Sequence, residues 1–180
     1  MKNDMKCILI TRDEIAKRVQ ELGREISDDY KGELPLLICI LKGSVVFYAD
    51  LVRCVDIPVT FEFMTASSYG SATVSSGEVK IISELDGKIK DRHVILVEDI
   101  IDSGRTIAYI KNDMLKKGVK SLKVCALLDK PDRRVSDVSA DYVGFTIPDE
   151  FVVGYGLDFD QKYRNFPDIG VLKPEMYETT

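Results

Sequence analysis

Residues 94–107 read Val-Ile-Leu-Val-Glu-Asp-Ile-Ile-Asp-Ser-Gly-Arg-Thr-Ile, and this stretch decides the fold. It begins as an apolar run typical of a buried strand, places three acids within five residues, and passes through a Ser-Gly-Arg-Thr turn into a helical pattern. Carboxylates accept hydrogen bonds from sugar hydroxyls, whereas turn amides and a helix N-terminus hold phosphate. The stretch therefore suits a ligand that has both hydroxyls and a phosphate, bound where a strand meets a helix.

Strands and helices alternate on both sides of this stretch. A capping box from Thr11 to Glu14 starts a helix whose apolar residues recur every three or four positions. We predict helices over 11–26, 45–52 and 106–117, the last ended by Gly118, strands over 36–41, 59–64, 79–85, 94–97 and 121–128, and short strands beyond Leu128. This order predicts an α/β fold with a mostly parallel, twisted sheet flanked by helices, whose ligands bind at the carboxyl ends of the strands.

Length and charge narrow the class of protein. The chain has 180 residues, which favours one domain, and 45% of them are hydrophobic, which is enough for a sizeable core. The net charge of -5 argues against a protein that binds nucleic acid, because such a protein needs a basic face. Residues 1–6 lack a signal-peptide core, and no apolar run approaches the roughly 18 residues of a membrane span. We therefore expect a cytoplasmic protein with no membrane partner.

The cysteines and the single histidine exclude some kinds of site. No Cys-x-x-Cys pair occurs, and three of the four cysteines lie in apolar runs, so we predict buried free thiols in a reducing compartment; the four are Cys7, Cys39, Cys54 and Cys125. His93 is the only histidine, which excludes a zinc site built on several histidines. Its place just before a strand favours a structural role over a Ser-His-Asp triad.

Residues 66–77 are rich in Ser, Gly, Thr and Ala and form the one long, weakly hydrophobic segment. Loops of this length inside a compact domain are usually functional lids or disordered segments. Tyr69, in the middle, is unusual for a plain linker. The sequence thus predicts a long loop here.

The acidic stretch is not a nucleotide-binding P-loop, because the Walker pattern is absent. A solvated acidic loop or a phospho-acceptor pocket would also gather acids at a strand end, but neither accounts for the turn and helix that follow. Residues 98–106 resemble the phosphoribosyl-pyrophosphate signature of type I phosphoribosyltransferases: two acids, two apolar residues, an acid, a small hydroxyl residue, Gly and a closing Thr. This pattern is far more specific than a lone Gly-rich loop.

Further segments resemble the bacterial hypoxanthine phosphoribosyltransferases over nearly the whole chain. They are Leu41–Ser44, Leu127–Lys130, Ile147–Asp158 and Tyr163-Arg164. The resemblance implies the type I phosphoribosyltransferase fold as a single domain over residues 1–180. Its core would span about residues 30–145. A small hood would come from the N-terminal segment and residues 146–180, and a lid loop would cover residues 66–78, with Ser68 and Tyr69 at its heart.

The resemblance also implies a role for each residue of the acidic stretch. Glu98 and Asp99 would accept from the ribose hydroxyls, directly or through metal-bound water, and Asp102 would act as general base or acid near purine N7. The 5-phosphate would be held by the turn Ser103, Gly104, Arg105 and Thr106, in which only the backbone of Arg105 need matter.

The remaining roles belong to other loops. Lys130 would donate to the purine O6 oxygen, Phe151 would stack on the purine ring and Val152 would meet the base edge through its backbone. Patterning alone would favour an exposed loop lysine and an ordinary core strand at these positions. Pyrophosphate would be bound by Lys42, Gly43 and Arg164, and Mg²⁺ by Glu98, Asp99 and Asp158.

The implied reaction transfers 5-phosphoribosyl from phosphoribosyl pyrophosphate to N9 of hypoxanthine, and of guanine, giving IMP or GMP and pyrophosphate in purine salvage. Two alternatives stay open at this point: a guanine- or xanthine-preferring transferase, and an RNA-binding regulator built on the same fold. The resemblance further implies a homodimer or homotetramer.

Overall fold

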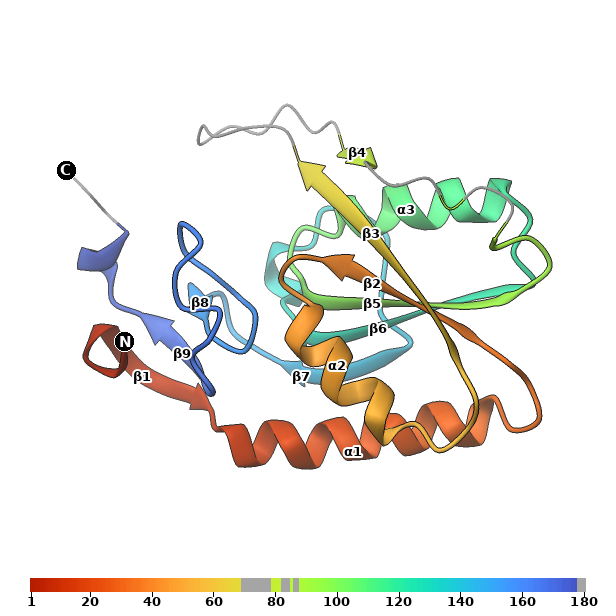
Figure 1. Cartoon of the computed structure of the whole chain (residues 1–180). Helices are drawn as coiled ribbons and strands as arrows, with labels where there is room; N and C mark the ends of the chain where they lie inside the picture. The colour runs from red at the N-terminus through yellow and green to blue at the C-terminus, as the bar shows by residue number, and fades with distance from the viewer. Residues whose placement is uncertain (69–78, 82–84, 86–87, 178–180) are drawn as a thin grey trace.

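The computed structural model describes residues 1–68, 79–81, 85 and 88–177. Its main sheet has six strands in the order β4-β3-β2-β5-β6-β7 (Figure 1). All neighbours pair in parallel except β3 and β4, which are antiparallel. The strands are β2 (Leu36–Leu41), β3 (Thr60–Ser68), β4 (Val79–Ile81), β5 (His93–Ile101), β6 (Ser121–Asp129) and β7 (Tyr142–Thr146). The predicted α/β fold with a mostly parallel sheet is confirmed.

Helices cover both faces of this sheet. Helices α1 (Arg12–Asp29) and α2 (Val45–Cys54) lie on one face, and α3 (Arg105–Lys116) lies on the other (Figure 1). Strand β5 lies between β2 and β6, so its side chains are buried on both sides: Ile95 and Val97 pack with α1 and α2, and Val94 and Leu96 pack with α3. A strand buried on both faces reads as a continuous apolar run, which explains the pattern of residues 94–97.

Helix α1 begins at the predicted capping box. The Thr11 hydroxyl accepts from the Glu14 amide at 3.3 Å, and the Glu14 carboxylate accepts from the Thr11 amide at 2.8 Å. The predicted apolar stripe is buried; it consists of Ile15, Val19, Leu22 and Ile26. At Gly23 the helix meets the end of α2, and a Cβ atom there would lie 2.4 Å from the Cys54 carbonyl oxygen. The missing side chain therefore lets the two helices cross closely.

A second, smaller sheet is built from both ends of the chain, and we call it the hood. It contains β1 (Met5–Ile10), β9 (Ile169–Leu172) and β8 (Val152–Val153), in the order β1-β9-β8 and antiparallel throughout (Figure 1). The sequence did not predict β1 or β9, because burial alternates along neither strand; two register shifts also interrupt their pairing. Within the described residues, no helix has the length and apolarity that crossing a membrane requires.

Two predicted boundaries need correction. Strand β5 continues to Ile101, so Glu98 and Asp99 lie within the strand rather than in the loop after it. Strand β3 continues to Ser68 and pairs with β4, so residues 66–68 belong to a strand although their composition suggested a loop. Tyr69 and the rest of the predicted lid, up to residue 78, lie outside the described residues.

One prediction of burial, that of Cys7, was also wrong. Cys7 is exposed on β1, whereas Cys39 and Cys125 are buried as expected and Cys54 is half-buried. The aromatic side chains of Phe61 and Phe63 on β3 are 50% and 46% exposed, because the face of β3 that carries them is not fully covered.

Candidate active site

The predicted site residues gather at the carboxyl ends of the parallel strands. Strands β2, β5 and β6 end at Leu41, Ile101 and Asp129, and α3 begins just beyond β5. A cavity of about 80 Å³ lies there, and its lining residues are Glu98, Ile100, Ile101, Asp102, Ser103, Gly104, Thr106 and Ile107. Ligands in open α/β sheets bind at this edge, so the structure places the acidic stretch where the fold binds ligands.

The turn from Ser103 to Thr106 leads into the N-terminus of α3. Gly104 caps the helix with φ of +79°, and a Cβ atom there would lie 2.5 Å from Val138 Cγ1. Both the left-handed backbone and the close approach favour glycine. The helix has 12 residues, and its first turn offers unpaired N–H groups and the positive end of its dipole. The Arg105 side chain is exposed to solvent. The turn is therefore suited to an anion through its backbone.

Glu98 and Asp99 form a pair of desolvated carboxylates. Burial raises the pKa of Glu98 well above its usual value, and the neighbouring Asp99 adds to this. Burial likewise raises the pKa of Asp99 to about 6, although the Ile100 amide donates to Asp99 Oδ1 at 2.9 Å and opposes the rise. Among the described residues, Glu98 Oε2 is buried without a hydrogen-bond partner. Such a pair is stabilised by hydroxyl donors or a cation.

These carboxylates fit the donors that Mg²⁺ prefers, because this ion takes one or two carboxylates and completes its shell with phosphate oxygens and water. In the part of the chain that the structure describes, no group of three or more His, Cys, Asp or Glu side chains could hold a metal by itself. An ion here would therefore need ligands from the substrate or from water.

The predicted pyrophosphate residues meet beside Asp99. The Leu41–Lys42 peptide bond is cis. A Cβ atom on Gly43 would lie 1.7 Å from Asp99 Oδ2, and a Cβ atom on Gly156 would lie 2.0 Å from the Gly43 carbonyl oxygen. Arg164 donates to the Gly156 carbonyl at 2.7 Å. Three segments far apart in the sequence thus come together here.

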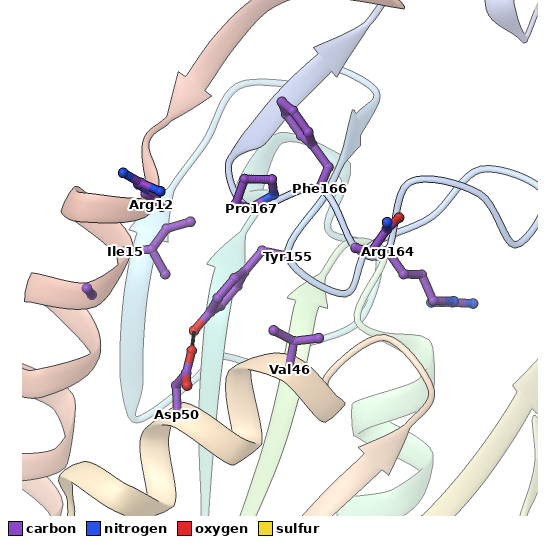
Figure 2. A pocket seen from close by; sticks show the side chains of 10 residues that line it. Arg12, Ile15, Val46, Asp50, Tyr155, Arg164, Phe166 and Pro167 are labelled. Carbon is purple, nitrogen blue, oxygen red and sulfur yellow. Dashed lines mark hydrogen bonds between the residues drawn. The ribbon is translucent and has the colours of Figure 1, made fainter. Parts of the chain in front are cut away.

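Arg164 also forms an ion pair with Asp158, with Nη2 and Oδ1 2.7 Å apart. The loop that carries Arg164 is tied to α2, because the Tyr155 hydroxyl donates to Asp50 Oδ2 at 2.6 Å. Figure 2 shows this bond in a cavity of about 320 Å³ between α1, α2 and the hood, with Arg164 at its edge. The loop between β8 and β9 of the hood therefore holds the Arg164 side chain in a fixed position relative to the main sheet.

Charged side chains also meet on the purine side of the predicted site. Lys130 is only 5% exposed, and its Nζ lies 3.6 Å from Asp149 Oδ1. Arg133 lies 3.7 Å from the same carboxylate oxygen and 3.4 Å from Asp102 Oδ1. Lysine is rarely buried unless it is paired, so the interpretation of Lys130 as an exposed loop lysine is wrong. The structure brings Lys130 and Asp102 into one network of ion pairs.

An aromatic cluster lies on the hood close to this network. Phe151 is 39% exposed and stacks on Tyr177, with ring centroids 4.8 Å apart and an interplanar angle of 28°. Phe159 meets Phe151 edge to face at 5.9 Å. Val152 is buried in β8, where it pairs with Val171. Phe151 thus has an accessible surface on a rigid aromatic support.

Sequence reasoning missed several of these residues. Asp149 and Phe159 lie in or next to the segment Ile147–Asp158, whose likeness was noted without giving them roles. Arg133 follows Lys130 in a charged loop, and nothing in the pattern indicated its pairing with Asp102. Tyr177 lies near the end of the chain, where no periodic pattern indicated packing on Phe151.

Comparison with known proteins agrees with this geometry. The family model described as "Phosphoribosyl transferase domain" matches residues 10–160. The chain therefore belongs to the phosphoribosyltransferase family.

Within that family, the chain is similar to hypoxanthine-guanine phosphoribosyltransferases. It is 50% identical over 179 residues to the enzyme of that name from Bacillus subtilis (strain 168), covering 99% of each chain. It is 48% identical over 177 residues to the one from Streptococcus thermophilus (strain CNRZ 1066), covering 98% of each. A solved hypoxanthine phosphoribosyltransferase from Staphylococcus aureus superposes with a TM-score of 0.95 at 45% identity, covering 99% of this chain and 97% of that one. The resemblance expected from residues 98–106 is confirmed.

Proposed function

We propose that this protein transfers the 5-phosphoribosyl group of phosphoribosyl pyrophosphate to N9 of hypoxanthine, and of guanine, releasing pyrophosphate and forming IMP or GMP in purine salvage. Similarity to relatives of that name over almost the full length supports the reaction. One structural observation carries the proposal: the buried Lys130 belongs to the same ion-pair network as Asp102, which directly precedes the anion-binding turn. A base and a sugar phosphate can thus be held next to each other.

The sugar phosphate is bound by the end of β5 and the start of α3. The backbone from Ser103 to Thr106 holds the 5-phosphate, and Glu98 and Asp99 accept from the ribose hydroxyls. The buried Glu98 Oε2 atom supports the assignment, because a ligand hydroxyl would supply the donor that it lacks among the described residues.

The purine is held between Lys130 and the hood. Lys130 donates a hydrogen bond to O6, and the amino group of a 6-amino purine could not accept this bond. Phe151 stacks on the purine ring, and Val152 contacts the edge of the base through its backbone. Asp102 accepts the proton of purine N7 as the bond from N9 to the ribose forms, and returns it as that bond breaks. The ion pair between Arg133 and Asp102 keeps the carboxylate oriented before the base arrives.

Pyrophosphate leaves on the side of Lys42, Gly43 and Arg164. Glu98, Asp99 and Asp158 would hold Mg²⁺ together with the substrate, and the ion would stabilise the charge that develops on the leaving oxygen. The protein contributes mainly orientation and electrostatics, because the transition state of such a transfer has cationic sugar character and needs little covalent assistance.

We infer a cytoplasmic enzyme that assembles into a homodimer or homotetramer. Free thiols at all four cysteines support a reducing compartment. The exposed aromatic side chains of Phe61 and Phe63 on β3 both contact Tyr48 of α2, and such a patch suits a second copy of the chain. Sedimentation equilibrium would measure the state, and a monomer at micromolar concentration would contradict this inference.

The direct test is to mix the protein with phosphoribosyl pyrophosphate, Mg²⁺ and hypoxanthine, guanine or xanthine, and to compare kcat/KM for the three bases. We expect IMP and GMP to form readily and adenine, a 6-amino purine, to be a poor substrate. Folded protein that forms no IMP would refute the proposal. A preference for xanthine or guanine over hypoxanthine would support the alternative transferase, and a salt-dependent shift of RNA without turnover would support the regulator.

A further inference from the structure

Arg134, which sequence reasoning gave no role, binds the backbone that leads into the phosphate turn. It follows the short helix η2 (Pro131–Arg133), and its side chain is 16% exposed. Its Nε donates to the Asp102 carbonyl at 3.1 Å, and its Nη2 donates to the Ile101 carbonyl at 3.4 Å. The same guanidinium donates to the Val138 carbonyl and forms an ion pair with Asp129. Two of its nitrogens therefore hold the end of β5 against the loop after β6, and the third binds within that loop.

The next two residues extend this hold. The amides of Val135 and Ser136 donate to the Ser103 carbonyl at 3.1 and 3.3 Å. The carbonyls of residues 102 and 103 are thus directed at residues 134–136, and that of Ile101 is shared between Arg134 and the Lys130 amide, which donates to it at 3.0 Å. A trans peptide group is planar, with C=O and N–H pointing in opposite directions. The N–H groups that follow these carbonyls, on residues 102, 103 and 104, therefore point away from Arg134.

The cavity at the phosphate turn lies on the side to which these N–H groups point. Its lining includes residues 101–104 but none of residues 134–138. Below the turn, the stem of Arg134 fills the space that a side chain on Gly104 would occupy, because a Cβ atom there would lie 2.7 Å from Arg134 Cδ. Arg134 thus supports the turn from the side opposite the ligand.

We propose that Arg134 is a positioning residue for the transfer reaction: by binding the carbonyls of Ile101 and Asp102, it aims the N–H groups of the same two peptide groups at the 5-phosphate and holds the backbone of Asp102 in place. This inference rests on the proposed function, since it takes the turn to be the phosphate site. Arg134 acts through the backbone and does not touch the substrate. Lysine cannot replace it, because an ammonium group has three donors on one atom, whereas the planar guanidinium reaches several acceptors in a fixed fork.

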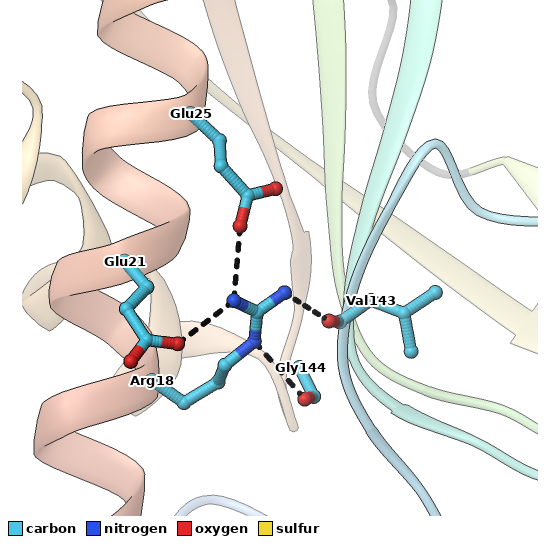
Figure 3. Close-up of polar contacts among 5 residues, drawn as sticks. All are labelled: Arg18, Glu21, Glu25, Val143 and Gly144. Atoms are coloured by element: carbon cyan, nitrogen blue, oxygen red, sulfur yellow. Dashed lines mark hydrogen bonds and ion pairs between the residues drawn. The ribbon is translucent and has the colours of Figure 1, made fainter.

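Arg18 offers a matched control on the same sheet. Figure 3 shows its guanidinium bound to two successive carbonyls of β7, with Nε 3.2 Å from the Gly144 oxygen and Nη2 2.8 Å from the Val143 oxygen. It also pairs with Glu21 and Glu25 on α1, and its side chain is 26% exposed. Arg18 therefore makes the same kind of contact as Arg134 but joins α1 to β7, away from the phosphate turn.

The test compares Arg134→Lys and Arg134→Gln with Arg18→Lys and Arg18→Gln. Each variant is assayed well below its melting temperature for kcat and for the KM of phosphoribosyl pyrophosphate and hypoxanthine, and the binding of ribose 5-phosphate is titrated by calorimetry. We expect both Arg134 variants to raise the donor KM and the ribose 5-phosphate Kd by about 10- to 100-fold, because misplacing a binding group by about 1 Å has effects of this size. The hypoxanthine KM should stay within about twofold, and the Arg18 variants should lose melting temperature only.

An unchanged donor KM and ribose 5-phosphate Kd in folded Arg134 variants would overturn the inference, because Arg134 would then be no more than a structural contact. If both Arg134 variants fail to fold, Asp129→Asn leaves the arginine in place and removes only its ionic partner. That variant should raise the donor KM in the same direction, and an unchanged value would equally overturn the inference. If the wild-type protein forms no IMP, the proposed function fails, while the ribose 5-phosphate titration still tests Arg134.

Discussion

Asp102 is the residue on which the chemistry of the proposed reaction depends. Asp102→Asn keeps the size of the side chain but removes the group that exchanges a proton with the purine. We expect kcat to fall by about 10²- to 10⁴-fold, the usual range for general acid–base catalysis, while the KM for phosphoribosyl pyrophosphate stays within about twofold. Steady-state kinetics with saturating hypoxanthine measures both. A variant that keeps its kcat but loses donor affinity would place Asp102 in binding rather than in proton transfer.

Gly43 allows the pyrophosphate loop to approach the buried acid pair. Gly43→Ala would place a Cβ atom 1.7 Å from Asp99 Oδ2, so either the loop or the carboxylate has to move. We expect kcat/KM for the donor to fall at least about tenfold, because the misplaced groups both serve the sugar pyrophosphate. Gly32→Ala is the control: a Cβ atom there meets nothing within 4 Å, although φ is +85°, so only stability should fall, by about 1 kcal/mol. Equal kinetics in the two variants would contradict this assignment.

At the residue scale, the sequence indicated which chemical groups the site contains but not how deeply each is buried or what it contacts. The types and spacing of Glu98, Asp99 and Asp102 indicated a sugar phosphate, and the family resemblance supplied the individual roles. The burial of Lys130 was not predictable, because its burial depends on a carboxylate 19 positions further along the chain, at Asp149. In the sequence Arg134 is one of several basic residues in a polar loop. Its role became apparent only from the structure, in which its side chain binds the backbone that leads into the phosphate turn.

At the element scale, a polar cluster joins the end of α1 to β6 and β7. Lys123 donates to Asp29 at 2.7 Å, and the Tyr142 hydroxyl donates to the same oxygen at 2.6 Å. The bond from Lys123, followed by that from Tyr142, lowers the pKa of Asp29 below its usual value. A carboxyl group whose folded pKa is lowered adds stability above its unfolded pKa of about 4, and this stability is lost as the pH falls below that value.

Asp29→Asn should therefore lower the free energy of unfolding by about 1 kcal/mol at pH 7, a modest value because the group is half exposed. The difference from the wild-type protein should disappear as the pH is lowered below about 4. Urea unfolding at several pH values measures it. Asp28→Asn, which removes one charge from an exposed neighbour on the same helix, is the matched control. A difference that does not shrink at all between pH 7 and pH 3 would exclude the ionic origin.

Periodicity predicted the elements that are long or buried on both faces. Helix α1 was predicted by its stripe and capping box, and the ends of β2 were predicted to the residue. Strands β1 and β9 were missed, because a short strand in a small sheet has too few alternating positions to stand out. The alternation along residues 59–64 predicted a strand, but it did not show that Phe61 and Phe63 lie on the exposed side of β3.

At the scale of the whole molecule, the four thiols should differ sharply in reactivity. Burial raises the pKa of Cys39 to about 11 and raises that of Cys125 as well, so neither should form a thiolate near pH 8. Cys7 is exposed, and Cys54 is half-buried. We expect Ellman's reagent to modify Cys7 quickly and Cys54 slowly in the native protein, and all four thiols only after unfolding. Cys7→Ser should remove the fast phase, and rapid reaction of four thiols in the native state would contradict the described core.

The site as a whole could not be assembled from the sequence, since it depends on contacts between distant segments. Gly43, Asp99, Gly156 and Arg164 meet because one loop of the main sheet, strand β5 and the loop between β8 and β9 converge on one point. The parallel sheet predicted which edge would carry the site. The position of the hood over that edge follows from tertiary contacts such as the bond from Tyr155 to Asp50, which no local pattern encodes.

The pairing of β1 with β9 has a consequence for how the protein is made. Met5 pairs with Leu172, so the hood sheet cannot close until nearly the whole chain has left the ribosome. Residues 94–107 emerge much earlier, and their strand and helix can fold as the nascent chain lengthens. The aromatic support under Phe151 is completed only by Tyr177. A growing chain should therefore complete the segment that binds the sugar phosphate before it completes the aromatic support for the purine.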